Sequence, residues 1–234
     1  MGGSGMEEDN RVEQGLEPQG MTAERAHFMG KWLTRLFWLN ILNIVANVLT
    51  QEEIINRVPP LYWVGSALNI IFLVGYILVL FRIAPGNAYY RKAGFISGAL
   101  AVGGFALGTM LGIFLYRGMD IGWMGAASVA ILVGELVAAY YEIQGHAQAV
   151  RGIDDGLAEK WKKNWRWLIG LLVALIPGLM IVLLSAFLGM LVIMAIMIGM
   201  IVVSIQRLVY LYKTARSFKQ LAGKFREGEA DGGA

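Results

Sequence analysis

Long apolar runs separated by short polar segments make up most of the chain from residue 25 onward. Each run holds roughly 20 residues, the length of helix that crosses the hydrocarbon core of a bilayer. The pattern predicts an all-α, polytopic integral membrane protein with six transmembrane helices. We place these helices at residues 32–50, 61–83, 93–116, 121–144, 167–185 and 189–212.

The last two helices are predicted from a single apolar stretch, residues 167–212, in which Arg207 is the only charged residue. A stretch of this length is too long for one crossing. No strong turn dipeptide marks a break in it. We place the break at the segment SAFLG, residues 185–189.

Polar segments stand at both ends of the chain. Residues 1–24 are acidic and lack apolar periodicity, which predicts a disordered tail. The first five residues, MGGSG, resemble the scar of an expression tag and are left out of the fold. Residues 25–212 are then expected to form the six-helix bundle, and residues 213–234 a cytoplasmic amphipathic tail.

The basic residues mark one side of the membrane. If the N-terminus is cytoplasmic, 18 of the 20 Lys and Arg residues lie in cytoplasmic segments, and only Arg57 and Arg117 fall outside. Cytoplasmic segments of membrane proteins carry this excess of basic residues, and Tyr and Trp gather at the interfaces, as they do here. We therefore expect both termini in the cytoplasm, and a bacterial cytoplasmic membrane as the location.

Composition removes several kinds of chemistry. Of the residues, 57% are hydrophobic and 16% charged, against about 25% charged in a soluble domain. The chain has no cysteine for a disulfide, a thiolate metal site or a nucleophile, and its two histidines cannot form a polyhistidine site. We predict no metal and no cofactor. The short loops leave no room for a soluble catalytic domain, and the basic residues follow the membrane boundary, which does not indicate nucleic-acid binding.

Glu135 is the only acidic residue well inside a predicted span, in the cytoplasmic half of the fourth. A carboxyl at this depth is costly and is expected to face the bundle interior. It can serve as a coupling group for protons or cations. Alternatively, it is a neutral, hydrogen-bonded acid, or an ion-pair partner of Arg35 or Arg82 at the inner boundary.

Amide side chains follow one face of the first span. Asn40, Asn43 and Asn47 are spaced three and four residues apart, and Asn69 lies inside the second span. Such amides bond across helices and hold them together. The other interpretation is that they line a substrate path.

The third span carries a glycine pattern. Gly94, Gly98, Gly104, Gly108 and Gly112 are separated mostly by four-residue steps. Small residues at this spacing let helix backbones approach closely, so we predict a tightly packed or dimerising helix. In the fifth span, Pro177 removes a backbone hydrogen bond and is a candidate hinge.

Two amphipathic segments flank the last two spans. In residues 154–170, a capping Asp154 or Asp155 precedes an apolar stripe surrounded by basic residues, and residues 211–225 repeat the pattern. We expect these helices to lie on anionic headgroups or to dock a partner, either a cytosolic subunit or a second copy of the chain. The lipid- or partner-facing residues would be Lys160, Trp161, Lys162, Lys163, Trp165, Arg166, Lys213, Arg216, Phe218 and Lys219.

A Glu-Glu-x-x-x-Arg motif at residues 52–57 resembles the first motif of the CAAX-protease and bacteriocin-processing membrane proteins. That family uses its glutamates with histidines in later Phe-x-x-x-His and His-x-x-x-Asn motifs. Here His146 is the only later histidine, with Glu142 in the Phe position and Val150 in the Asn position. The resemblance implies an intramembrane protease, but it carries over no catalytic residue.

The predicted topology gives the same motif an ordinary role. It lies in an outer loop, where Arg57 is placed to form a helix-end ion pair with Glu53. Pro59 and Pro60 end this segment and begin the second span.

Two classes of function are left besides that remote alternative. The first is a transport-type component without catalytic machinery, either a small permease subunit or a coupled carrier, with Glu135 on its pathway. The second is a structural or regulatory membrane anchor that recruits a cytosolic partner through its basic tails. The topology resembles that of permease subunits driven by a cytosolic ATPase only at the level of fold.

Overall fold

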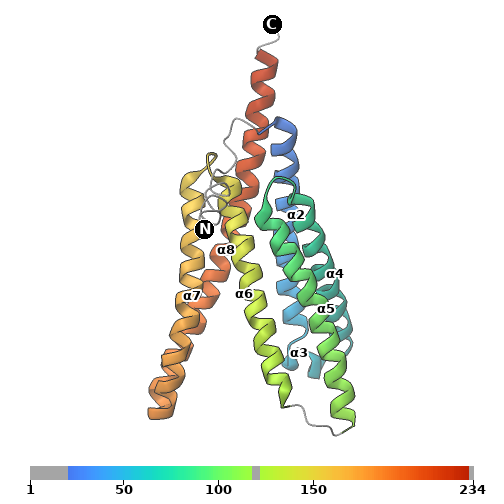
Figure 1. Ribbon diagram of the computed structural model, residues 1–234, viewed down its shortest axis with the longest axis vertical. Helices are drawn as coiled ribbons and strands as arrows, with labels where there is room; N and C mark the ends of the chain where they lie inside the picture. Colours follow the sequence, from blue (N-terminus) through green and yellow to red (C-terminus); the bar gives the residue numbers. More distant parts are fainter. Residues whose placement is uncertain (1–20, 118–121, 232–234) are drawn as a thin grey trace, which may run out of the picture. The chain divides into compact units, whose positions relative to one another are not determined.

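A computed structural model describes residues 21–117 and 122–231 (Figure 1). The described residues form seven α-helices. They are α2 (Ala23–Leu49), α3 (Glu52–Arg57), α4 (Pro60–Ile83), α5 (Ala88–Tyr116), α6 (Trp123–Val150), α7 (Asp155–Leu184) and α8 (Ala186–Asp231). All except α3 are long and apolar enough to cross a membrane. The predicted all-α class and multi-pass architecture are confirmed to this extent.

Three of the helices are much longer than the spans predicted for them. α2 begins at Ala23, α7 begins at Asp155, and α8 continues to Asp231. At 1.5 Å per residue, the 30 residues of α7 and the 46 of α8 measure about 45 and 69 Å, against about 30 Å of hydrocarbon. The polar segments are thus helical extensions of the spans. Most of the predicted disordered tail, including the tag scar, lies outside the described residues.

The predicted break between the last two spans is confirmed. α7 ends at Leu184 and α8 begins at Ala186, with Ser185 between them in an extended conformation (φ −154°, ψ 108°). The turn is tight, because a Cβ atom on Gly189 would lie 2.4 Å from the Cα atom of Val182. Only glycine permits this approach. α7 and α8 consequently run side by side (Figure 1).

The chain divides into two compact units. The first, residues 35–145, contains most of α2 and α6 together with α3, α4 and α5. The second combines the described residues of 1–34 and 146–234, which are the start of α2, the end of α6, and α7 and α8. Both units contain buried hydrophobic residues.

Small residues mark the helix crossings of the 35–145 unit. A Cβ atom on Gly65 would lie 2.6 Å from Cγ2 of Thr50, the residue after α2, and one on Gly134 of α6 would lie 2.6 Å from Leu100 Cδ2 of α5. Gly75 of α4 faces Leu39 of α2 in the same way. Close backbone approach through small residues is how membrane helices gain packing contacts.

The core of the second unit includes the apolar stripe of the C-terminal segment. Leu211, Ala215, Phe218 and Ala222 are all buried. The start of α2 packs on this stretch, because a Cβ atom on Gly30 would lie 2.9 Å from Lys219 Cγ. The prediction that Phe218 faces lipid or a partner is therefore wrong. Helices of the same chain cover the apolar stripe that contains Phe218, and this cover removes the stripe from water just as a bilayer would.

Large hydrophobic side chains are exposed along all six long helices. Phe105 on α5 is 81% exposed, and Leu183 and Leu184 at the end of α7 are 79% and 87% exposed. A soluble monomer rarely exposes contiguous apolar surface of more than a few hundred Å². Lipid tails are the solvent that such a surface suits, which agrees with an integral membrane protein.

Candidate functional site

Glu135 lies on an exposed face of α6. Its exposed neighbours along the helix are apolar, with Leu132, Val133 and Val137 between 40% and 54% exposed. Among the described residues Glu135 has no hydrogen bond or ion pair, so the alternatives in which it pairs with Arg35 or Arg82 are not realised. No helix of the 35–145 unit covers it, so the predicted interior-facing position is not realised within that unit.

The amides of α2 bond within their own helix. Asn40 Nδ2 donates to the carbonyl oxygen of Leu36 at 2.9 Å, and Asn47 Nδ2 donates to Asn43 Oδ1 at 3.4 Å. Neither bond reaches another helix. Asn69 is half-buried on α4. The described hydrogen bonds of α2 therefore give no support to these amides as connections between helices.

The glycine pattern of α5 contributes little to packing within this chain. A Cβ atom on Gly94 would be in ordinary contact with Leu80 and Phe81 of α4, at 3.5 Å. On Gly98, Gly104 or Gly108 it would meet nothing within 4 Å. Gly112 lies where only the backbone is described. At these described glycines the only contact is the ordinary one at Gly94, and the alternative of a dimerising helix stays a prediction.

Pro177 does not interrupt its helix. α7 runs unbroken from Asp155 to Leu184, with Pro177 exposed and its neighbour Gly178 buried against Val192 and Ile196 of α8. A hinge at Pro177 stays a prediction.

The glutamate motif occupies α3, between the first two long helices. Glu52, Glu53 and Arg57 are all exposed, and α4 begins directly afterwards at Pro60. Among the described residues, no group of three or more His, Asp or Glu side chains lies close enough to hold a metal ion. The motif therefore has the surroundings of a surface turn.

A polar cluster that was not predicted joins α4 and α6 to the residue before α5. The hydroxyl of Tyr76 donates to Glu142 Oε2 at 2.5 Å, and Glu142 is only 1% exposed. Asn87 Nδ2 donates to the carbonyl oxygen of Gly145 at 3.1 Å, while its Oδ1 accepts from the backbone N–H of Tyr89. These bonds connect three helices. The available signals in the sequence were a second carboxyl, Glu142, near the end of the fourth predicted span and Asn87 in the loop after the second.

A second polar cluster joins α6, α7 and α8. The ring of His146 stacks on that of Trp161 at 4.6 Å between centroids, and both residues are fully buried. Trp161 Nε1 donates to Thr214 Oγ1 of α8 at 3.0 Å. The prediction that Trp161 faces lipid or a partner is wrong. A buried indole needs a hydrogen-bond acceptor, and Thr214 supplies it.

The other residues predicted to face lipid or a partner have mixed surroundings. Lys162 is half-buried and pairs with Glu159 of its own helix at 3.1 Å, and Trp165 is also half-buried. The others are exposed, namely Lys160, Lys163, Arg166, Lys213, Arg216 and Lys219. At the start of α7, the side chain of Asp154 accepts from the backbone N–H of Leu157, so Asp154 rather than Asp155 is the N-cap.

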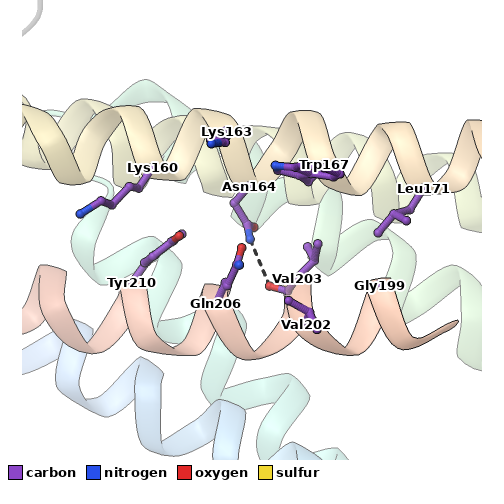
Figure 2. A pocket seen from close by; sticks show the side chains of 10 residues that line it. All are labelled: Lys160, Lys163, Asn164, Trp167, Leu171, Gly199, Val202, Val203, Gln206 and Tyr210. Atoms are coloured by element: carbon purple, nitrogen blue, oxygen red, sulfur yellow. Dashed lines mark hydrogen bonds between the residues drawn. The ribbon is translucent and has the colours of Figure 1, made fainter. Parts of the chain in front are cut away.

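A cavity of about 450 Å³ lies between α7 and α8 (Figure 2). α7 contributes Lys160, Lys163, Asn164, Trp167 and Leu171 to its lining. α8 contributes Gly199, Val202, Val203, Gln206 and Tyr210. Asn164 is 2% exposed and reaches across to α8, where its Nδ2 donates to the carbonyl oxygen of Val203 at 3.1 Å. Its Oδ1 atom is buried and has no hydrogen-bond partner.

Comparison with protein-family models, with curated proteins and with solved structures gave no match.

Proposed function

We propose that the chain is a transport-type membrane component, a small permease subunit or a coupled carrier, in which Glu135 is the coupling carboxyl and no catalytic machinery is present. One observation carries this proposal. Glu135 is exposed in the middle of a membrane-length helix, among apolar neighbours, without a hydrogen bond or ion pair from the described residues.

The energetics favour a functional role for this side chain. A charged group at the centre of a membrane helix costs about 2.5–3.5 kcal/mol on insertion scales, so it needs water, a proton or a partner. Glu142, two turns further along α6, has the surroundings expected of a structural carboxyl, because it is buried and accepts a hydrogen bond from Tyr76. Glu135 has no such arrangement. A water-accessible path, along which the carboxyl gains and loses a proton, would offset its cost.

The amides of α2 support the same function. Their described bonds stay within the helix, and Asn43 and Asn40 remain partly accessible while Asn47 is exposed. Amides that do not connect helices are free to face a polar solute. Asn40, Asn43, Asn47 and Asn69 are therefore proposed as pathway residues, in the same unit as Glu135.

The orientation proposed for this function has both termini in the cytoplasm. The support is the distribution of the basic residues, 18 of 20 on one side of the predicted spans. The helical extensions of α2, α7 and α8 all belong to the basic side. A bacterial cytoplasmic membrane is the proposed location.

Proteoliposomes test the proposal. The purified chain is reconstituted into vesicles that enclose a pH-sensitive dye, and a potassium gradient with valinomycin imposes a membrane potential. We expect proton influx that Glu135→Gln abolishes, because an amide cannot carry the proton, and that Glu135→Asp retains in part. Glu53→Gln is the matched control, since it removes one carboxyl from exposed α3 and should leave the flux unchanged.

Proton flux that survives Glu135→Gln would contradict the proposal. So would the absence of flux from wild-type protein that is shown by circular dichroism to be folded in the same vesicles. Equal loss in the Glu53→Gln control would indicate a general effect of charge, and would also count against a special role for Glu135.

A second candidate function is a membrane anchor that recruits a cytosolic partner. One observation favours it: the C-terminal part of α8 buries its apolar stripe in its own chain, yet Lys213, Arg216 and Lys219 stay exposed on the helix. A partner with an acidic surface would complement these basic residues. Replacing these three residues by Gln should abolish co-purification of the partner while wild-type folding is retained, and proton flux in vesicles without any partner would argue against this candidate.

A further inference from the structure

The cavity between α7 and α8 changes from polar to apolar along its length. Lys160, Lys163 and Tyr210 line it toward the basic ends of the two helices, whereas Leu171 and Gly199 line it deeper in their apolar stretches (Figure 2). Lys160 and Leu171 are separated by three turns of α7, about 16 Å. A ligand that fills this cavity must be polar at one end and apolar at the other.

Asn164 stands at the change from polar to apolar, with an unused acceptor. The orientation of its amide is fixed, because the carbonyl oxygen of Val203 can only accept, so the group that faces it at 3.1 Å must be the NH₂ group. Oδ1 is then the buried atom without a partner, and it belongs to a side chain that lines the cavity. A buried acceptor without a donor is unfavourable, so the cavity is complementary to a ligand that brings a donor.

Lys160 and Lys163 provide the charge. Both side chains are exposed, and neither forms an ion pair with a described carboxylate. They lie one turn apart on the face of α7 that carries Asn164. Two free ammonium groups beside an unfilled acceptor match a phosphate group with a neighbouring hydroxyl.

We propose that this cavity is a binding site for an anionic phospholipid whose headgroup carries a hydroxyl donor, as phosphatidylglycerol does. Lys160 and Lys163 bind the phosphate, and Asn164 Oδ1 accepts from the headgroup hydroxyl. Trp167, Leu171 and Val202 contact the upper part of an acyl chain. The site lies in the second unit and does not depend on Glu135 or on transport.

A soluble phosphate ester shares the headgroup chemistry. It would use the polar end and leave the apolar half of the cavity empty, whereas a phospholipid fills both. The lining therefore favours the lipid, and the experiment includes a headgroup without acyl chains to separate the two sources.

The test measures lipid binding to the full chain in detergent, by native mass spectrometry and by thermal stabilisation. Four probes are compared: phosphatidylglycerol; phosphatidylmethanol, which has the same charge but no hydroxyl; phosphatidylcholine, which has no net charge; and glycerol 3-phosphate. We expect phosphatidylglycerol to bind tightest, phosphatidylmethanol about tenfold more weakly because it lacks one hydrogen bond, and the other two more weakly still.

Substitutions separate this site from general attraction to a charged surface. Lys160→Gln with Lys163→Gln should weaken phosphatidylglycerol binding about 30-fold, given about fivefold for each basic residue near anionic headgroups. Lys162→Gln with Arg166→Gln removes the same charge from the same segment but touches no part of the cavity lining. That control should weaken binding by about twofold or less.

Two further variants test the donor and the tail. Asn164→Ala should abolish the preference for phosphatidylglycerol over phosphatidylmethanol. Val202→Trp leaves the Asn164 bond in place and fills the apolar end, so it should weaken both lipids equally. Equal loss in the two double variants, wild-type binding without headgroup preference, or glycerol 3-phosphate binding as tightly as the lipid would each overturn the proposal.

Discussion

Removing the hydroxyl of Thr214 should destabilise the second unit through the side chain that it leaves unpaired. Trp161 Nε1 donates to Thr214 Oγ1 at 3.0 Å, and neither residue is exposed to solvent. The indole also contacts the rings of His146, stacked at 4.6 Å, and Tyr210, edge-on at 5.9 Å. Thr214→Val keeps the shape of the side chain but leaves a buried N–H group unsatisfied, which costs about 1–3 kcal/mol.

A double-mutant cycle isolates this cost. In a Trp161→Phe background the same Thr214→Val substitution leaves no N–H group unsatisfied, so it should be close to neutral. We expect a coupling energy of about 1–2 kcal/mol between the two positions, within the range for residues that share a hydrogen bond. The free energy of unfolding is measured by titrating the folded protein in mixed micelles with sodium dodecyl sulfate and following far-ultraviolet circular dichroism.

Thr109→Val provides the matched control for this cycle. Its hydroxyl donates to the carbonyl oxygen of Phe105 in its own helix at 2.9 Å, at an exposed position of α5. Removing it should change the free energy of unfolding by less than about 0.5 kcal/mol. A Thr214→Val effect as mild as this control would contradict the role assigned to the bond between Trp161 and Thr214. So would an equal cost of Thr214→Val with Phe and with Trp at position 161.

Three further predictions concern the other helix contacts, all measured by the same titration. Tyr76→Phe removes the donor to the Glu142 carboxyl and should cost about 1–3 kcal/mol; no loss would show that this bond is dispensable. Asn87→Asp should be milder than Asn87→Ala, because a carboxylate still caps α5 although it cannot donate to the carbonyl of α6. Gly189→Ala should destabilise by at least about 1–3 kcal/mol through a clash with backbone, whereas Gly104→Ala should stabilise by about 0.5–1 kcal/mol; equal effects would contradict the described packing.

The number and placement of the spans could be predicted because bilayer thickness sets the length of an apolar run. The same rule does not say where a helix ends. The polar segments before Trp167 and after Tyr212 continue as α7 and α8, since a helix leaving the membrane satisfies its own backbone hydrogen bonds in water too. The break at Ser185 was predictable from length alone, and Gly189 explains why the chain can turn there.

The surroundings of the amphipathic segments could not be predicted from their pattern. An apolar stripe must leave water, but a bilayer and the core of the same protein satisfy that requirement equally. Trp161 and Phe218 are predicted to face lipid or a partner, and both are buried in the second unit. The polar residues beside them, His146 and Thr214, were the available signal. An indole that is buried in protein needs a fixed acceptor, whereas one at the membrane interface finds water.

The polar face of α6 links the fold to the proposed function. Ser128, Glu135 and Glu142 follow one another at seven-residue steps, and seven residues of a helix return within about 20° of the same face. Glu142 is buried and bonded to Tyr76 of α4, yet Ser128 and Glu135 on the same face are exposed. The cover that the 35–145 unit gives to this face therefore ends between Glu142 and Glu135.

In a bilayer, the uncovered part of this α6 face must contact either water or another protein surface, because hydrocarbon offers the Glu135 carboxyl no hydrogen bond. Glu135→Leu tests the alternative that Glu135 faces lipid and has no functional role. In that case the variant would be more stable than wild type by about 2.5 kcal/mol or more and would keep every activity of the chain.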